Sequence, residues 1–188
     1  MNIIIFEDHN IKDLNPFSIN HSSFELKCGV YSNLDRIINS FDEDINYYLI
    51  VRDELKELIQ EKFPRYTVNP KNIPEGLYLN GAALWNKDNI SKIKNGYAFS
   101  SSGNLISFVS DVSISYHDIN NVIKKTGKVT SDIDIDYISY LWDCIDLLDK
   151  SCKACQVNKL SVLFLSLIDI NLLEVFERLA RFNVVPVE

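Results

Sequence analysis

A chain of 188 residues is long enough to bury a single hydrophobic core, and contents of 46% hydrophobic and 11% aromatic residues are typical of a packed globular protein rather than a disordered one. Its formal net charge of -7 would be repelled by nucleic acid and by anionic membranes, and no cluster of Lys and Arg along the chain offsets it. We therefore expect neither nucleic acid nor a membrane among its partners.

The first element is a short buried strand. Residues Ile3–Phe6 form a continuous apolar run, which is typical of a strand covered on both faces, and the polar residues that follow predict a loop. The run has no basic flank and is too short for the hydrophobic region of a signal peptide, so we expect a cytoplasmic protein. In that compartment the four cysteines are expected to stay reduced.

Helical and strand-like patterns alternate after this run. Apolar residues recur at three- and four-residue steps in some segments, whereas others are short and β-rich. The expected elements are a helix within residues 30–38, a strand over 47–51, a helix from 53 to 63, and short strands over 66–68 and 77–79. This alternation favours an α/β fold, with a sheet covered by helices.

A hairpin and a long helix are expected next. Residues Tyr97–Val109 contain two apolar segments joined by Ser-Ser-Gly-Asn, whose Gly and Asn suit a tight turn. Ser131 or Asp132 resembles a helix N-cap, and the apolar residues after it share one helical face as far as about Lys150.

The C-terminal part, residues 151–188, differs in character. Residues 160–168 are almost wholly apolar, and Asp169, Asn171 and Glu174 interrupt the pattern before it reaches the roughly 20 apolar residues that a membrane span needs. We expect an apolar helix here that packs on its own domain or pairs with a second copy in a homo-oligomer.

Three sequence blocks resemble one known family. Leu14–Val30 reads LNPFSINHSSFELKCGV and is similar to an opening block with Arg-Pro followed by Glu-Leu-Arg-x-Gly. Leu77–Leu84 resembles a Tyr, apolar, Asn-Gly, Leu stretch, and Tyr140–Asp143 resembles a Trp-Asp motif. In this order the blocks resemble the N-terminal domain of proteins similar to N-acetylglucosamine-1-phosphate uridylyltransferase and glucose-1-phosphate thymidylyltransferase, the sugar nucleotidyltransferase-like family.

The resemblance implies a fold, a reaction and ligands. It covers residues 1–150 as one domain, a Rossmann-like nucleotide-binding sheet of the nucleotide-diphospho-sugar transferase type, and it leaves 151–188 as a divergent helical segment. The implied activity is transfer of a nucleotidyl group from a nucleoside triphosphate to a sugar 1-phosphate, with release of pyrophosphate. Mg²⁺ is the implied cofactor.

The family's cations are only partly present. The Gly-rich loop of orthodox members is missing after the first strand, His21-Ser22 stands in place of Arg-Pro, and Lys27 stands in place of the second Arg. A lysine keeps the charge but loses the two-pronged guanidinium. Lys27 is the candidate catalytic, phosphate-binding residue, and its block adds His21, Glu25 and Gly29 as candidate substrate-binding residues.

Two strand ends supply further candidates. Asn80 and Gly81 follow the strand expected over 77–79, at the end where α/β sheets bind ligands, and we assign them to substrate binding. Asp8 follows the first strand and Asp111 follows the hairpin, so these two are the candidate Mg²⁺ ligands. Because the catalytic set is incomplete, the alternative is a non-catalytic nucleotide-binding or assembly module with a degenerate active site.

The apolar C-terminal segment generates the first prediction. Deletion of residues 157–188 is expected to reduce solubility or stability, or to change the oligomeric state, because the segment would otherwise cover an apolar surface. Sedimentation and thermal unfolding of the full and shortened chains measure this. A soluble monomer as stable as the full chain would show that the segment contributes nothing to the fold.

Overall fold

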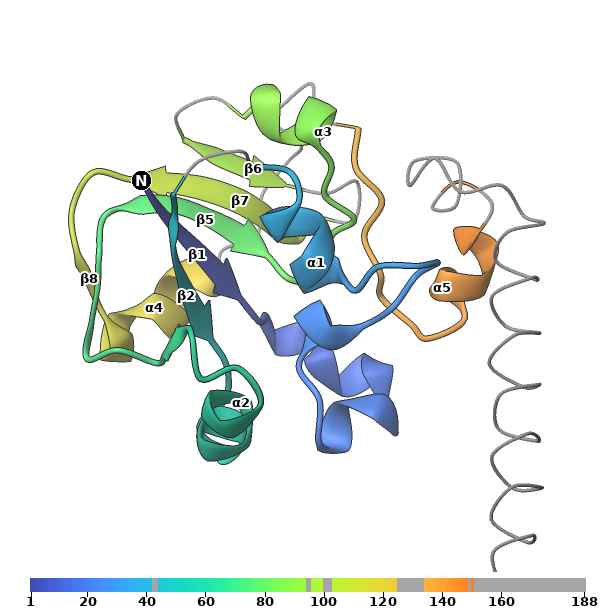
Figure 1. Ribbon diagram of the computed structural model, residues 1–188, viewed down its shortest axis with the longest axis horizontal. Helices are drawn as coiled ribbons and strands as arrows, with labels where there is room; N and C mark the ends of the chain where they lie inside the picture. The colour runs from blue at the N-terminus through green and yellow to red at the C-terminus, as the bar shows by residue number, and fades with distance from the viewer. Residues whose placement is uncertain (42–43, 94–95, 100–102, 125–133, 149, 151–188) are drawn as a thin grey trace, which may run out of the picture.

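A six-stranded mixed sheet forms the centre of the protein (Figure 1). The computed structural model describes residues 1–41, 44–93, 96–99, 103–124, 134–148 and 150. The strand order is β3-β2-β1-β5-β7-β6, and a separate two-stranded ladder joins β4 and β8. The predicted α/β class is therefore confirmed, with a sheet that is parallel on one side and antiparallel on the other.

The parallel half of the sheet contains a topological switch point. From β1 the chain moves outward to β2 and β3, and it then returns to place β5 on the other side of β1. The strand bounds are Asn2–Phe6 for β1, Asn46–Ile50 for β2, Thr67–Val68 for β3 and Gly76–Asn80 for β5. Such a reversal leaves a crevice outside the carboxyl ends of β1 and β5, where ligands of α/β proteins bind.

The antiparallel half confirms the predicted hairpin. Strand β6 (Tyr97–Phe99) pairs with β7 (Leu105–Ser110), and β7 pairs with β5. The small ladder of β4 (Asn72–Ile73) and β8 (Ile114–Ser115) was not expected from the sequence. Two-residue strands carry too little alternation to be recognised.

Helices cover both faces of the sheet, as Figure 1 shows. Ile3 and Ile5 of β1 pack in a cluster with residues of α1 (Asn33–Ile38) and α2 (Lys56–Lys62), whereas Ile4 and Phe6 face α4 (Tyr116–Ile123). These four β1 residues are all 0% exposed, which explains their unbroken apolar run. The shorter helices are α3 (Lys87–Ser91) and α5 (Asp143–Asp146).

The expected helix from 131 or 132 to 150 is wrong over the part that the structure describes. Residues 134–142 are not helical, and helix appears only from Asp143 onward, in α5 and at Leu148 and Lys150. Tyr137 instead forms an isolated antiparallel bridge with Ala83. The amides of Leu84 and Ile138 donate across this bridge, to Asp136 and Ala82 respectively, at 2.9 Å each. Backbone pairing beyond the carboxyl end of β5 therefore overrides the helical spacing. Three apolar residues of that spacing stay exposed, namely Trp142, Ile145 and Leu148.

The expected apolar helix and the second segment, residues 151–188, lie outside the described residues. Among the helices that the structure does describe, none combines the length and apolar character needed to span a bilayer.

Gly81 marks a close approach between β5 and a 3₁₀ turn, Ser23–Glu25. A Cβ added at Gly81 would lie 2.9 Å from Cβ of Phe24 and 3.0 Å from Oγ of Ser23. The Gly81 amide donates to the Phe6 carbonyl at 2.9 Å, and its carbonyl accepts from Nδ2 of Asn33 at 2.8 Å. The backbone cannot retreat without breaking these bonds, so the position requires glycine for steric reasons.

Replacing Gly81 with Ala is accordingly expected to lower the free energy of unfolding by about 1–3 kcal/mol, the usual cost of overpacking a buried site. Chemical denaturation of the variant and the original chain measures the difference. An unchanged midpoint would mean that β5 and the Ser23–Glu25 turn can separate without cost.

Candidate functional site

Asp8, the second residue after β1, joins three distant parts of the chain. Its Oδ2 accepts hydrogen bonds from Nδ2 of Asn80 at 2.7 Å and from the hydroxyl of Tyr137 at 2.5 Å. Its Oδ1 accepts the amide of Asn10 at 2.9 Å. Asp8 is only 7% exposed, so these donors replace most of the water that its carboxylate loses.

Asn80 ends β5 at the switch point and is 0% exposed. Its Nδ2 donates to Asp8 at 2.7 Å and to the carbonyl of Leu105 at 2.8 Å, and its Oδ1 accepts the amide of Ala82 at 2.8 Å. Both donors of the amide are therefore used within the chain. In this structure Asn80 holds Asp8 in place and connects β5 with β7.

A buried ion pair lies beside this cluster. Nη1 of Arg52, two residues after β2, is 2.8 Å from Oε1 of Glu7, and the two side chains are 25% and 2% exposed. Nη2 of Arg52 donates to the carbonyls of Ser18 and His21. Burial raises the pKa of the Glu7 carboxyl, and the Arg52 guanidinium partly offsets that rise. Arg52 thus ties residues 18–21 to the ends of β1 and β2.

A cavity beside this cluster, the carboxyl-edge cavity, has a volume of about 360 Å³. It is bounded by the residues after β1, the residues after β2 and one side of α4. Its lining includes Asp8, Lys12, Arg52, Asp53 and Lys124. Acidic and basic side chains both line this cavity, so it could receive a phosphate only close to its cations.

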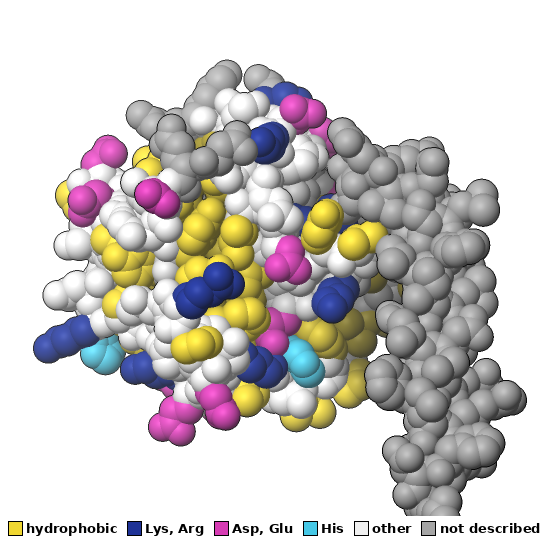
Figure 2. Space-filling model, viewed as in Figure 1, with side chains coloured by type: hydrophobic (Ala, Val, Ile, Leu, Met, Phe, Trp, Pro, Cys, Tyr) yellow, Lys and Arg dark blue, Asp and Glu magenta, His cyan; other side chains and the backbone are white. Residues whose placement is uncertain are grey.

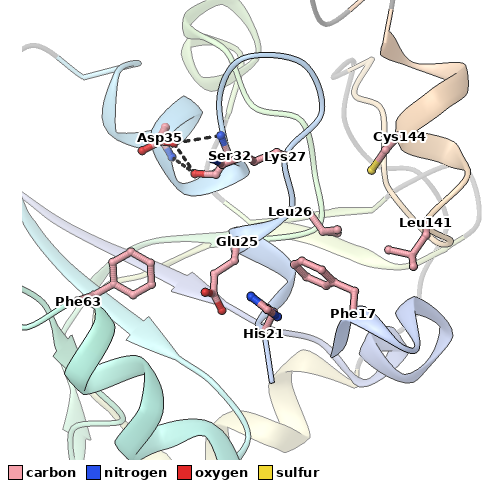
Figure 3. A pocket seen from close by; sticks show the side chains of 10 residues that line it. All are labelled: Phe17, His21, Glu25, Leu26, Lys27, Ser32, Asp35, Phe63, Leu141 and Cys144. Atoms are coloured by element: carbon pink, nitrogen blue, oxygen red, sulfur yellow. Dashed lines mark hydrogen bonds between the residues drawn. The ribbon is translucent and has the colours of Figure 1, made fainter. Parts of the chain in front are cut away.

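The second cavity, the opening-block cavity, is larger, at about 670 Å³, and lies along the segment that resembles the family's opening block (Figure 3). Its lining residues are Phe17, His21, Glu25, Leu26, Lys27, Ser32, Asp35, Phe63, Leu141 and Cys144. Figure 3 shows Ser32 and Asp35 on one side and Phe17, His21 and Glu25 on the other. Aromatic rings and polar groups in one cavity of this size are typical of small-molecule sites.

Local contacts orient the polar side chains of the opening-block cavity. The His21 ring stacks on Phe17 with centroids 4.6 Å apart, and its Nδ1 is buried with no hydrogen-bond partner among the described residues. Glu25 forms an ion pair with Lys62 at 2.8 Å. Lys27 is exposed, and no ion pair links it to the described part of the chain. His21 and Lys27 therefore retain hydrogen-bonding capacity.

The structure brings some of the predicted residues together and separates others. His21, Glu25 and Lys27 share the opening-block cavity, and Gly29, with φ of 88°, makes the turn that leads to α1. Asp8 lines the other cavity. Asn80 and Gly81 are buried and line neither cavity.

Asp111 does not join Asp8. Ser110 pairs with Gly76 at the beginning of β5, whereas Asp8 follows Phe6, which pairs with Asn80 at the end of β5. Because β7 runs antiparallel to β5, Asp111 lies near the amino end of β5, whereas Asp8 lies near its carboxyl end. The two carboxylates cannot share one ion.

A protein-enclosed metal site is absent from the described residues, where no group of three His, Cys, Asp or Glu side chains could hold an ion. Asp8 nevertheless keeps one acceptor position, on Oδ1, after its three hydrogen bonds. Mg²⁺ is often bound by one or two carboxylates together with substrate phosphates. Asp8 fits that role as a single protein ligand.

Two residues of this site were missed in the sequence. Arg52 occupies the position after β2 that Asp8 occupies after β1, and this equivalence at two parallel strand ends was a usable signal. Tyr137 gave no such signal, because it belongs to a segment whose spacing predicts a helix.

Charges on the face shown in Figure 2 are mixed. Among the residues coloured there, Lys and Arg side chains lie between Asp and Glu side chains around an apolar centre. Phosphate binding on this face would therefore depend on individual cations rather than on a broad basic surface.

The fold and the site together define an α/β protein with a cavity at the carboxyl ends of two parallel strands, β1 and β2. A model of the sugar nucleotidyl transferase family matches residues 3–154, and the chain therefore belongs to that family. The resemblance found in the sequence is thus confirmed, and membership points to nucleotidyl transfer in general. No curated protein matches the chain.

The Glu7–Arg52 pair gives a stability prediction. Arg52→Met is expected to lower the free energy of unfolding by roughly 3 kcal/mol, because it leaves a buried carboxylate without its counter-charge. The free energy of unfolding of Arg52→Lys should lie between those of the original chain and Arg52→Met. An ammonium can pair with Glu7 but cannot also reach both carbonyls.

The same variant should change the pH dependence. Without Arg52 the pKa of folded Glu7 rises further above its value of 4.5 in the unfolded chain. Between the pKa of Glu7 in the folded original chain and its higher pKa in folded Arg52→Met, the variant binds more protons, so its stability relative to the original chain falls as pH rises through that window and recovers on acidification. Denaturation of both proteins across the window tests this, and a pH-independent difference would contradict it.

Proposed function

We propose that this protein transfers a nucleotidyl group from a nucleoside triphosphate to a sugar 1-phosphate. A phosphate oxygen of the sugar 1-phosphate attacks the α-phosphorus, the bond from that phosphorus to the bridging oxygen of the β-phosphate breaks, and pyrophosphate leaves. The observation that carries the proposal is Asp8, which Asn80 and Tyr137 hold at the switch point of a sheet from this family.

Such a reaction needs positioned charge more than covalent chemistry. We assign Lys27 to charge neutralisation on a substrate phosphate, because it lines the opening-block cavity and makes no ion pair with the described residues. The unpartnered Nδ1 of His21 can exchange a hydrogen bond with the substrate, and Glu25 can accept one from a sugar or ribose hydroxyl. Gly29 shapes the turn beside them.

The remaining candidates act through the backbone or through Asp8. Asn80 supports substrate binding by orienting Asp8, and Gly81 allows β5 to approach the opening block. Mg²⁺ bound by the triphosphate and Asp8 would neutralise charge on the phosphates. The cytoplasm, where nucleoside triphosphates are available, is the proposed location.

A second candidate is a non-catalytic nucleotide-binding or assembly module. It is favoured by the internal use of the polar groups at the carboxyl edge. Glu7 and Arg52 neutralise one another, and the side-chain amide of Asn80 donates both of its hydrogen bonds to groups within the chain. A site built mainly for structure would look like this.

Binding and turnover separate the two candidates. Calorimetry with each magnesium nucleoside triphosphate is expected to show binding, and a pyrophosphate-release screen across triphosphates and sugar 1-phosphates is expected to find an active pair. Binding without pyrophosphate release in any combination would favour the module. Absence of binding at millimolar ligand would overturn the enzyme.

Lys27→Ala tests the proposed phosphate contact. Loss of a charged hydrogen bond to substrate is expected to lower kcat/KM by about tenfold to a hundredfold, with little effect on stability because Lys27 is exposed. Lys56→Ala, at an exposed position on α2, is the matched control. Pyrophosphate release and thermal unfolding are measured for all three proteins, and an unchanged rate in Lys27→Ala would remove this residue from the site.

A further inference from the structure

Tyr137 lies in an extended segment whose backbone is fixed on both sides. It forms the bridge with Ala83, and the flanking bonds are Leu84 amide to Asp136 carbonyl and Ile138 amide to Ala82 carbonyl. These partners directly follow Asn80 at the end of β5. The Tyr137 backbone is therefore held against the part of the sheet that borders Asp8.

The Tyr137 hydroxyl both donates and accepts a hydrogen bond. It donates to Oδ2 of Asp8 at 2.5 Å and accepts from Nδ2 of Asn10 at 3.3 Å. A phenol has one proton to donate, and here that proton is directed at the Asp8 carboxylate.

The hydrogen bonds at Asp8 are divided unequally between its two oxygens. Oδ2 receives both side-chain donors, from Tyr137 and Asn80, whereas Oδ1 receives only the Asn10 amide. Since each carboxylate oxygen offers about two acceptor positions, Oδ2 is saturated and Oδ1 retains one. Without the Tyr137 hydroxyl, a rotation of the carboxylate would cost less.

We propose that Tyr137 is a positioning residue that locks the Asp8 carboxylate so that Oδ1 is presented to a magnesium-bound phosphate ligand. The inference rests on the proposed function for the role of Asp8. To that role it adds Tyr137 as a positioning residue and Oδ1 as the oxygen that the ligand approaches. It also assigns a role to residues 134–142, because this segment brings the Tyr137 hydroxyl to Asp8 from a distant part of the sequence.

Tyr137→Phe is the decisive variant because it removes the hydroxyl and keeps the ring, which packs against the hydrophobic core. Tyr140→Phe is the matched control. It makes the same chemical change in the same segment, at a ring that is 42% exposed and stacks on Trp142 with centroids 4.5 Å apart. A general effect of losing a tyrosine hydroxyl would appear in both variants.

The first measurement tests the contact itself and needs no ligand. In a double-mutant cycle of Asp8→Ala and Tyr137→Phe, the unfolding equilibrium constants should be non-additive by about tenfold, as expected for a hydrogen bond to a charged group. Additive effects would overturn the inference, because they would mean that the two side chains do not act on one another.

The second measurement uses magnesium pyrophosphate, which depends on neither the base nor the sugar. Calorimetry should show binding to the original chain and to Tyr140→Phe, and binding at least fivefold weaker to Tyr137→Phe. With pyrophosphate alone and EDTA, Tyr137→Phe should match the original chain, because Asp8 then has no ion to contact. A merely structural defect would weaken binding in both conditions.

The outcomes distinguish the inference from the proposed function. If the original chain binds magnesium pyrophosphate and Tyr137→Phe binds it equally well, the positioning role is overturned while the function stands. Equal weakening with and without magnesium overturns it as well. If the original chain binds no magnesium pyrophosphate at millimolar concentration, the proposed function fails and the role of Tyr137 fails with it.

Discussion

The complete burial of β1 is the constraint on which the rest of the structure depends. Ile3, Ile4, Ile5 and Phe6 are all 0% exposed, with helices on both faces and parallel neighbours on both edges. The first polar residues after such a strand can reach solvent and partners only beyond its carboxyl end. Glu7 and Asp8 therefore meet the residues after β2 and β5 at the one edge where a parallel sheet binds ligands.

Burying two acidic side chains at the carboxyl ends of these strands costs free energy, because each carboxylate loses water. This cost is offset differently for each of them. Glu7 is neutralised by Arg52, which also ties down residues 18–21. The donors to Asp8 come from Asn10, Asn80 and Tyr137 and are all neutral, so none of them supplies a counter-charge. This division leaves Asp8 as the carboxylate that can still attract a cation, whereas Glu7 serves the fold.

The two cavities follow from the same arrangement. Residues 18–21, held by Arg52, run beside the ends of β1 and β2 and contribute His21 to the opening-block cavity, while Asp8 and Arg52 line the carboxyl-edge cavity. Both cavities thus depend on Arg52, through its own side chain in one and through the segment that it holds in the other. Lys27 is the cationic lining residue of the opening-block cavity, whereas Lys12, Arg52 and Lys124 line the carboxyl-edge cavity.

Local pattern alone determined the elements whose burial is uniform or regularly periodic. The apolar run of β1, the helix that ends at Lys62 and the hairpin of β6 and β7 were predictable, as was the grouping of His21, Glu25 and Lys27, because these residues are close in sequence. Only the tertiary structure decided the contacts that join distant segments. Tyr137 meets Asp8 because backbone pairing at Ala83 overrides a helical spacing, and Asp111 misses Asp8 because β7 runs antiparallel to β5. Strand direction and long-range pairing are set by the whole sheet, so no local spacing of residues could have revealed them.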